Sequence, residues 1–474
     1  MIMNNKVINV SKKTFLNSVV LFGVLLLVSI IATYIVPRGT FSLVEGEGGA
    51  LVEDYSSYVQ LDNQSGINIL KGIFAPFLIL FSKDGLSIIM LILFLLVVSG
   101  SFQIMNDTNG MKIIVNKLIK KFESKKKLLI SVIVLAFMCF GAFFGLFEEV
   151  LALLPLIIVL AISLGYDSFT GFLICVVATG FGFASAITNP FTVIPASMII
   201  GISPMSKIWY RVIVFLVMYA LLLLYVFHHL KVIEKDPSKS PTYENDMIKR
   251  ENLSEEKNEN NNRVSLIYSI FLLTVLASII IVTSIESIRG YTVVFLIAIF
   301  LFGGIFSGYL VNKDFKIVFK SFLNGVVAAL PAILLVLLSS SVKYVLEEGM
   351  ILATIAHSIS NFIEGKNIFL VAGLIYLIVL VLEFFVSSST AKCILVMGVL
   401  SCVNVNLSKE LLVLIYLFGD GYTNVLFPTS PVLLIGLSMI GINYFTWLKK
   451  SKWLFIFNFT IVLLLISIGI LIGY

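Results

Sequence analysis

Charged side chains are scarce in this chain of 474 residues, where Asp, Glu, Lys and Arg make up 13%. A typical soluble domain carries about 25%, so the composition excludes a disordered protein and a nucleic-acid binder. The four cysteines lie in apolar stretches without metal-ligand spacing, which excludes a secreted disulfide scaffold and predicts packing roles. The sequence has no ATP-binding motif and neither an HExxH nor a GxSxG pattern, so we expect no enzyme activity and no ATP-driven step.

Apolar residues, in contrast, make up 59% of the chain, and the mean hydropathy is +1.05. No soluble core of this length hides so much apolar surface, so the lipid bilayer must act as the solvent. In lipid, helices satisfy their own backbone hydrogen bonds. The composition therefore predicts an all-α polytopic membrane protein.

Nine segments have the roughly 20 apolar residues that a transmembrane helix needs, and two of these are long and broken. Two further apolar regions are about twice as long as a span and carry polar residues at mid-length. This pattern favours re-entrant helical hairpins, which enter and leave on one side. The nine spans are 17–36, 86–105, 168–201, 208–230, 264–285, 291–311, 325–346, 410–443 and 453–473, and the hairpins are 129–163 and 367–407.

Lysine and arginine predict the orientation of the spans. Five segments hold 23 of the 33 basic residues, and all five fall on one side if the hairpins do not cross. The other side has an acid-rich loop at 37–85. We therefore expect a protein of the cytoplasmic membrane with its N-terminus in the cytoplasm and its C-terminus outside. The basic segments are the N-terminus, 106–128, 231–263, 312–320 and 444–452.

The second half of the chain repeats the first at an offset of 241 residues, with low identity but with polar interruptions, glycines and prolines in the same order. Thr188-Asn189-Pro190 then falls on Thr429-Ser430-Pro431, and Glu148-Glu149 falls on Ser389-Thr390. One extra span at 264–285 would invert the second half relative to the first. Inverted repeats with interrupted spans are typical of secondary transporters.

The repeat predicts four parts of the chain. The segment between the halves mixes acidic and basic residues with an asparagine run, which predicts disorder. The parts are a first inverted repeat at 1–231 (scaffold helices, hairpin 129–163, broken span 168–201), a disordered cytoplasmic linker at 232–263, a linking span at 264–289 and a second inverted repeat at 290–474 (hairpin 367–407, broken span 410–443).

Two adjacent carboxylates, Glu148 and Glu149, mark the turn of the first hairpin. At membrane depth each costs about 2.5–3.5 kcal/mol, so we expect them to face a wet cavity, a cation or a partner. One interpretation is a site for a cation, a proton or a substrate amine, with one carboxylate pointing to the site and the other bonding backbone at a helix start. The alternative is a structural pair that caps the hairpin helix.

Hydroxyl side chains and a lysine mark the turn of the second hairpin. Such hydroxyls can cap free N–H groups or bind a carboxylate. The lysine either binds an acidic group of the substrate or neutralises a glutamate of the first hairpin. The four candidate residues are Ser388, Ser389, Thr390 and Lys392.

Each broken span carries a proline after polar residues. Proline removes a helical hydrogen bond, and non-helical backbone at membrane depth survives only where it lines a cavity. The freed carbonyls and the polar side chains suit an ion, whereas a simple proline kink is the alternative. Nearby glycines predict a close approach of hairpin and span, and an aspartate adds a third candidate acid. The candidate residues are Thr188, Asn189, Asp420, Asn424, Thr429 and Ser430.

These motifs resemble the YfcC family, which is grouped with the DcuC-type C4-dicarboxylate carriers and, more distantly, with the AbgT and divalent-anion/sodium symporter proteins. The resemblance covers nearly the whole chain except the segment at 232–263. The motifs that carry it are GAFFGLFEE at 141–149, GYD at 165–167, TNPFTV at 188–193, FGDGYTN at 418–424 and PTS at 428–430.

The resemblance implies a secondary transporter that forms a homodimer, with a static scaffold and a mobile, elevator-like transport domain built from the hairpins and broken spans. It also implies either basic amino acid transport, including arginine/ornithine exchange, or C4-dicarboxylate transport. The glutamate pair suits an amino group and the second hairpin suits a carboxylate, so an amino-acid-like substrate ranks first. A dicarboxylate or other organic anion is the alternative.

Coupling to Na⁺, coupling to H⁺ and pure exchange stay open, and we expect no cofactor and no resident metal. Two other classes of protein are weaker interpretations. A channel is one of them, because broken inverted repeats around a site at the midplane suit alternating access better than an open pore. An intramembrane protease would use Asp167 and Asp420, but the glycine that its motif needs is replaced by Leu417.

Overall fold

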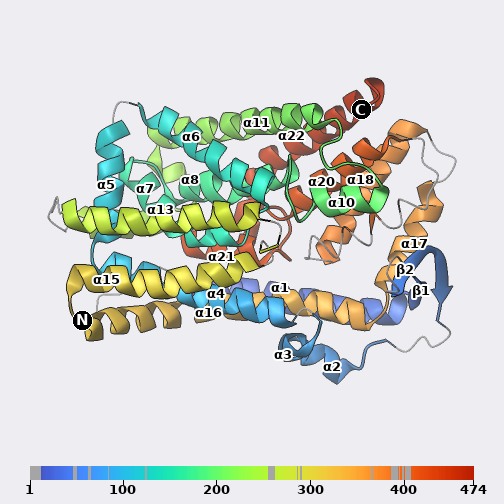
Figure 1. Cartoon of the computed structure of the whole chain (residues 1–474), viewed down its shortest axis with the longest axis horizontal. Helices are drawn as coiled ribbons and strands as arrows, with labels where there is room; N and C mark the ends of the chain where they lie inside the picture. Colours follow the sequence, from blue (N-terminus) through green and yellow to red (C-terminus); the bar gives the residue numbers. More distant parts are fainter. Residues whose placement is uncertain are drawn as a thin grey trace.

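A computed structural model shows a helical protein with one small antiparallel sheet (Figure 1). Seven helices of the described residues are long and apolar enough to cross a membrane. Helices also lie at each of the nine predicted spans, although several are short or interrupted. The structure describes residues 12–45, 51–61, 66–83, 85–122, 125–254, 262–285, 287–288, 291–363, 367–385, 393, 396–397, 400 and 407–474.

The first part of the chain contains the sheet. Strands β1 (Gly39–Glu45) and β2 (Leu51–Gln60) pair antiparallel, with a register shift between Phe41 and Ser42. The all-α prediction missed this hairpin, which lies in the acid-rich segment after the first helix. The helices of this part are α1 (Lys12–Ile35), α2 (Ile69–Ile73), α3 (Ala75–Leu78), the 3-10 turn η1 (Ile79–Phe81) and α4 (Gly85–Asp107).

The β-hairpin is attached to a helix from the second half of the chain, α17 (Leu352–Ile363). The ring of Tyr58 stacks on His357 with centroids 4.2 Å apart, and its hydroxyl lies 2.9 Å from the hydroxyl of Thr354. The hairpin therefore connects residues about 300 positions apart in the sequence.

The first hairpin and the first broken span occupy the middle of the chain. Both are interrupted by short π-helical or 3-10 turns, where the regular helical ladder is disturbed. The elements are α5 (Gly110–Phe122), α6 (Lys126–Cys139), η3 (Phe140–Phe144), η4 (Glu149–Ala152), α7 (Leu154–Ser163), α8 (Ser168–Phe172), η5 (Leu173–Val177), α9 (Ala178–Ala184), α10 (Val193–Ile200) and α11 (Ile208–Lys235).

The second half has a similar order of elements. Its described helices are η6 (Pro237–Lys239), α12 (Tyr243–Ser254), α13 (Asn262–Ser284), α14 (Thr292–Ala298), η8 (Ile299–Gly303), α15 (Gly304–Asn312), α16 (Phe315–Glu348), α17, α18 (Ile368–Phe385), α20 (Lys409–Thr423), α21 (Pro431–Ile440) and α22 (Tyr444–Leu471).

The expectation of a disordered linker at 232–263 is not met over its first part. Helix α11 continues to Lys235, and η6 and α12 follow it. Polar side chains of this segment, rather than apolar ones, bind it to the rest of the chain, which is why composition alone suggested disorder. Residues 255–261 lie outside the described part of the chain.

Two groups of helices organise the packing. Helix α16 packs along α4 and α1 on one side of the molecule, and α20 packs between α9 and α18 on the other (Figure 1). Small residues allow the first contact, because a Cβ on Gly325 of α16 would lie 2.4 Å from the carbonyl oxygen of Ser99. Long-range contacts of this kind bring the two halves of the chain together.

Candidate functional site

The first hairpin turns at a glycine that no other residue can replace without strain. Helix α6 continues into η3 and stops at Gly145, whose φ of +68° is left-handed. That conformation favours glycine. A Cβ on Gly145 would also lie 2.4 Å from Oδ1 of Asn189. The hairpin turn is therefore pressed directly against the break of the neighbouring span.

The two glutamates that follow this turn differ in their surroundings. Glu149 begins the 3-10 turn η4, and its Oε2 accepts a hydrogen bond of 3.1 Å from the backbone N–H of Phe147. Its side chain is half-buried, whereas that of Glu148 is exposed. The sequence predicted that one of the two carboxylates bonds backbone, and Glu149 makes such a bond.

Asn189 lies at the centre of the first break and is fully buried. Its side-chain N–H donates to the carbonyl oxygen of Gly141 at 3.1 Å, and its Oδ1 accepts from the backbone N–H of Phe191 at 2.9 Å. From the sequence, this amide is predicted to be a ligand. In the structure both ends of the amide bind backbone, one end that of the hairpin and the other that of the break itself.

Further hydrogen bonds connect the break to the hairpin. The carbonyl oxygen of Ala142 accepts from the N–H groups of Ile187 at 2.9 Å and Thr188 at 3.2 Å. The hydroxyl of Thr188 donates to the carbonyl oxygen of Phe143 at 3.4 Å, at a partly exposed position. Hairpin turn and break therefore form one hydrogen-bonded unit.

At the break of the second broken span, a serine caps the helix that follows. Helix α20 ends at Thr423, and α21 starts at Pro431 with Ser430 as its N-cap, whose hydroxyl accepts from the N–H of Leu433 at 3.4 Å. Thr429 and Ser430 are both buried. The serine therefore has the capping role that is common for this residue type.

Asp420 of α20 and Asn424, the residue that follows this helix, lie about one helical turn apart. Asp420 is completely buried, and Asn424 is half-buried and donates its side-chain N–H to the carbonyl oxygen of Asp420 at 3.0 Å. Tyr416, one turn earlier, interacts electrostatically with Asp420 and with Glu383 of α18. Two carboxylates are therefore buried between α18 and α20, whereas only Asp420 was expected from the sequence.

Glycines let the two broken spans touch, and Gly182 confirms the predicted close approach of hairpin and span. A Cβ on Gly421 of α20 would lie 2.0 Å from the backbone N of Ala184 in α9, and one on Gly180 would lie 2.4 Å from Cγ1 of Val425. A Cβ on Gly182 would lie 2.0 Å from the carbonyl oxygen of Met138 in the first hairpin. Hairpin, first break and second span consequently meet at one place.

The candidate residues of the second hairpin cannot be placed beside this site. Helix α18 is described to Phe385, and the turn that follows lies outside the described residues. The residues concerned are Ser388, Ser389, Thr390 and Lys392. Among the residues that the structure does describe, no three His, Cys, Asp or Glu side chains gather as a metal site.

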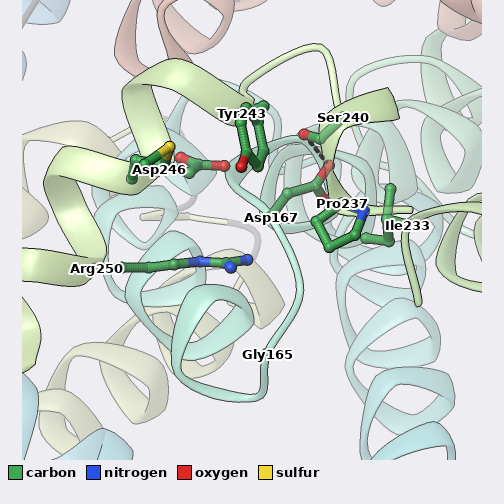
Figure 2. Close-up of a pocket in the computed structure, with 9 residues that line it drawn as sticks. Gly165, Asp167, Ile233, Pro237, Ser240, Tyr243, Asp246 and Arg250 are labelled. Carbon is green, nitrogen blue, oxygen red and sulfur yellow. Dashed lines mark hydrogen bonds between the residues drawn. The ribbon is translucent and has the colours of Figure 1, made fainter. Parts of the chain in front are cut away.

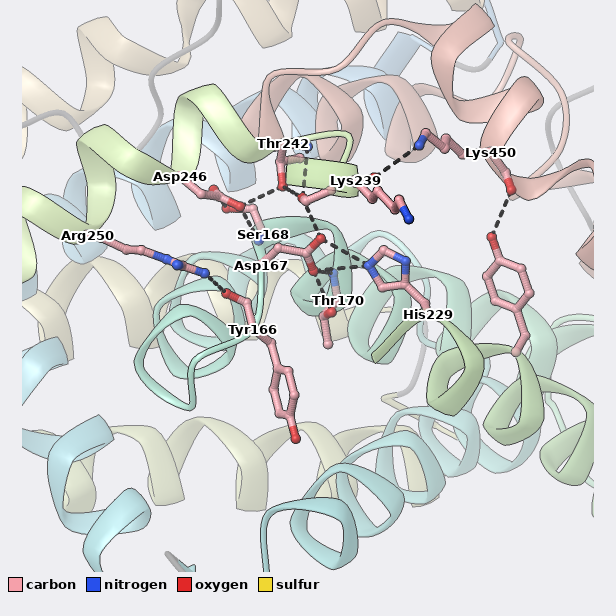
Figure 3. A network of polar contacts seen from close by, with 12 residues as sticks. Tyr166, Asp167, Ser168, Thr170, His229, Lys239, Thr242, Asp246, Arg250 and Lys450 are labelled. Carbon is pink, nitrogen blue, oxygen red and sulfur yellow. Dashed lines mark hydrogen bonds and ion pairs between the residues drawn. The ribbon is translucent and has the colours of Figure 1, made fainter. Parts of the chain in front are cut away.

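Sequence reasoning missed a polar network that α12 forms at one end of the helical bundle (Figure 3). Asp167 caps α8 by accepting from the N–H of Thr170 at 2.8 Å, and also accepts from the hydroxyl of Ser240 at 2.6 Å and from Nε2 of His229 at 3.0 Å. Asp246 of α12 accepts from the backbone N–H of Ser168 at 2.7 Å and from its hydroxyl. We call the residues 165–168, 229 and 236–250 the linker network.

A small pocket opens within the linker network. Figure 2 shows Asp246 and Arg250 of α12 on one side of it and Ile233 and Pro237 on the other, with Asp167 between them. Ser240-Pro241-Thr242 before an acidic first turn is a helix-start signal, so the sequence did contain a sign of α12.

These features define a multi-pass helical membrane protein whose interrupted helices meet at one site. The chain belongs to the DcuC family, described as C4-dicarboxylate anaerobic carriers, and the family match covers residues 16–471. It is therefore a membrane transporter of the DcuC and YfcC type.

Individual relatives agree with this assignment. The chain is 28% identical over 471 residues to the "Putative basic amino acid antiporter YfcC" of Escherichia coli (strain K12), with 92% of each chain covered. It is 26% identical over 369 residues to an uncharacterized protein of Haemophilus influenzae, covering 75% of this chain and 70% of that one.

Two solved structures are similar at lower sequence identity. The YdaH transporter of Alcanivorax borkumensis has a TM-score of 0.45 and 12% identity, with 96% of this chain and 99% of that chain covered. MtrF of Neisseria gonorrhoeae, titled as one of a class of antimetabolite efflux pumps, has a TM-score of 0.44 and 15% identity, with 95% and 94% covered.

Proposed function

We propose that this protein is a secondary active transporter of a basic amino acid, taken up or exchanged across the cytoplasmic membrane. One observation carries the proposal: an exposed carboxylate, Glu148, follows a hairpin turn that is hydrogen-bonded to a broken helix. A carboxylate at membrane depth marks a functional site by default. Its negative charge would attract a cationic group of the substrate.

The site has the rigidity that selective binding needs. Gly145 and Asn189 hold the turn against the break, so the carboxylate projects from a preorganised backbone rather than from a loose loop. The buried Asp420 lies on the span that contacts the same break. We assign the α-carboxylate of the substrate to the second hairpin, with its hydroxyls and Lys392.

The proposed mechanism is alternating access of the elevator type in a homodimer. The interrupted helices and the similar order of elements in the two halves support inverted repeats. The hairpins and broken spans would move as one unit against a scaffold that includes α4 and α16. The driving force is a gradient of Na⁺ or H⁺, or exchange of one substrate for another.

Transport of a C4-dicarboxylate or another organic anion is the alternative. The description of the DcuC family favours it, as do the lysine and hydroxyls of the second hairpin. The glutamate pair argues against it, because a carboxylate ligand repels an anionic substrate. The name of the Escherichia coli relative points to a basic amino acid.

Uptake into proteoliposomes tests the proposal. The purified chain should accumulate labelled arginine or ornithine, and unlabelled ornithine inside the vesicles should accelerate entry of arginine if exchange is the mode. Sodium and pH gradients applied separately identify the coupling. Uptake of succinate with no uptake of arginine or ornithine would contradict the proposal and establish the alternative.

A further inference from the structure

Helix α12 contacts the beginning of the first broken span through charged and polar groups (Figure 3). Asp246 accepts from the N–H and the hydroxyl of Ser168, the first residue of α8. Lys249 donates to the same hydroxyl at 2.8 Å, and Arg250 donates to the carbonyl oxygen of Tyr166 at 2.7 Å. Both Ser168 and Asp246 are buried. The start of α8 is therefore bound by three side chains that lie on one face of α12, within little more than one helical turn.

The neighbouring residue of α12 contacts the end of the second broken span. Asn245 donates its side-chain N–H to the carbonyl oxygen of Gly441 at 3.1 Å. Gly441 has a left-handed φ of +77° and terminates α21, and a Cβ there would lie 2.3 Å from Nδ2 of Asn245. The contact is thus as close as the backbone allows.

A second connection lies beside the first. Lys450 of α22 donates to the carbonyl oxygen of Lys239 in η6 at 3.1 Å, and Tyr225 of α11 donates to the carbonyl oxygen of Lys450 at 3.1 Å. The segment between α11 and α12 is therefore attached to α22 as well, immediately after the second broken span.

Adjacent side chains, those of Asn245 and Asp246, thus reach the ends of two broken spans that belong to different halves of the chain. We propose that α12 is a clamp that ties the start of α8 to the end of α21, so that the two broken spans move as one body. The clamp goes beyond transport as such, because it concerns how the two halves are mechanically joined.

Hydrogen exchange on the full-length protein in nanodiscs tests the clamp without any transport assay. Asp246→Ala removes both carboxylate oxygens, so the N–H and the hydroxyl of Ser168 lose their acceptor on α12. We expect exchange of the Ser168 amide to accelerate at least tenfold, and amides 441–443 at the other end to accelerate severalfold. The matched control is Glu244→Gln, which removes an exposed carboxylate from the same helix and should leave both ends unchanged.

Asn245→Ala tests the clamp at its other end, where α12 contacts Gly441. It should accelerate exchange at 441–443 and, through α12, also at Ser168. It keeps the test decisive if Asp246→Ala does not fold. Acceleration confined to the mutated end in either variant would show that α12 is only a local cap and would overturn the proposal. Failure of arginine uptake would not bear on this result, because the exchange rates are measured without substrate.

Discussion

The side-chain amide of Asn189 donates a 3.1 Å hydrogen bond to the carbonyl oxygen of Gly141, 48 residues earlier in the chain. This bond joins the break in the first interrupted span to the π-helical end of the first hairpin. Because Asn189 is fully buried, no water is available to replace its partners. The geometry of the glutamate turn depends on this contact.

Asn189→Ala should therefore destabilise the fold as well as transport. It removes the acceptor of the Phe191 N–H, at a cost of about 1–3 kcal/mol, and one of the two hydrogen bonds that the carbonyl oxygen of Gly141 accepts, the other coming from the N–H of Gly145. We expect a clear drop in the thermal unfolding midpoint in detergent, together with loss of uptake. Thr188→Val, at a partly exposed position, is the control and should retain the wild-type midpoint. An unchanged midpoint in Asn189→Ala would refute the structural role.

The same substitution should have different effects at the two glutamates. Glu148→Gln removes an exposed charge and should raise the half-saturating concentration of a cationic substrate at least tenfold, with an unchanged unfolding midpoint. Glu149→Gln weakens the hydrogen bond to the N–H of Phe147 and should lower the midpoint. Uptake kinetics and thermal unfolding of both variants check this. Wild-type kinetics in Glu148→Gln would reduce the pair to a hairpin cap.

Gly421→Ala should push the two broken spans apart and destabilise the fold. Its Cβ would meet the backbone N of Ala184 at 2.0 Å, and backbone cannot rotate away as a side chain can. Overpacking of this kind costs about 1–3 kcal/mol. Gly373→Ala in α18, where the new Cβ meets nothing within 4 Å, is the matched control and should be neutral or slightly stabilising. Equal unfolding midpoints for the two variants would contradict the close packing.

The linker network should withstand mild acid. Burial raises the pKa of Asp167, but the hydrogen bond and charge of His229, with hydrogen bonds from Ser240 and Thr170, outweigh it and lower the pKa from 3.8 to about 2. A lowered pKa means that the ionised carboxylate stabilises the fold above about pH 4 and that this contribution disappears as the pH falls to about 2.

Unfolding of wild type and Asp167→Asn as a function of pH measures this contribution. The difference in stability between them should still be present at about pH 5 and should shrink between about pH 4 and pH 2. Glu244→Gln, at an exposed site near the network, serves as the control. A difference that already disappears near pH 5 would show that His229 does not hold the carboxylate.

Local sequence patterns determined much of this protein. Apolar runs located the spans, because a helix in lipid needs a length of apolar residues that can be read directly. Gly180, Gly182 and Gly421 predicted close helix contacts, and the pair at 148–149 predicted that one carboxylate would bond backbone. Motifs within these segments also pointed to the transporter family to which the chain belongs.

Only the tertiary structure decided which partner each polar group takes. Nothing in the sequence indicates that Asn189 binds Gly141, that Asp246 binds Ser168, or that Glu149 binds the N–H of Phe147. Hydrogen bonds between residues far apart in the chain depend on how helices pack, and a charged, asparagine-rich segment has the same composition whether it is bound or disordered. The linker helix α12 was missed for that reason, because polar contacts with α8 and α21 give it a place that its own residues do not encode.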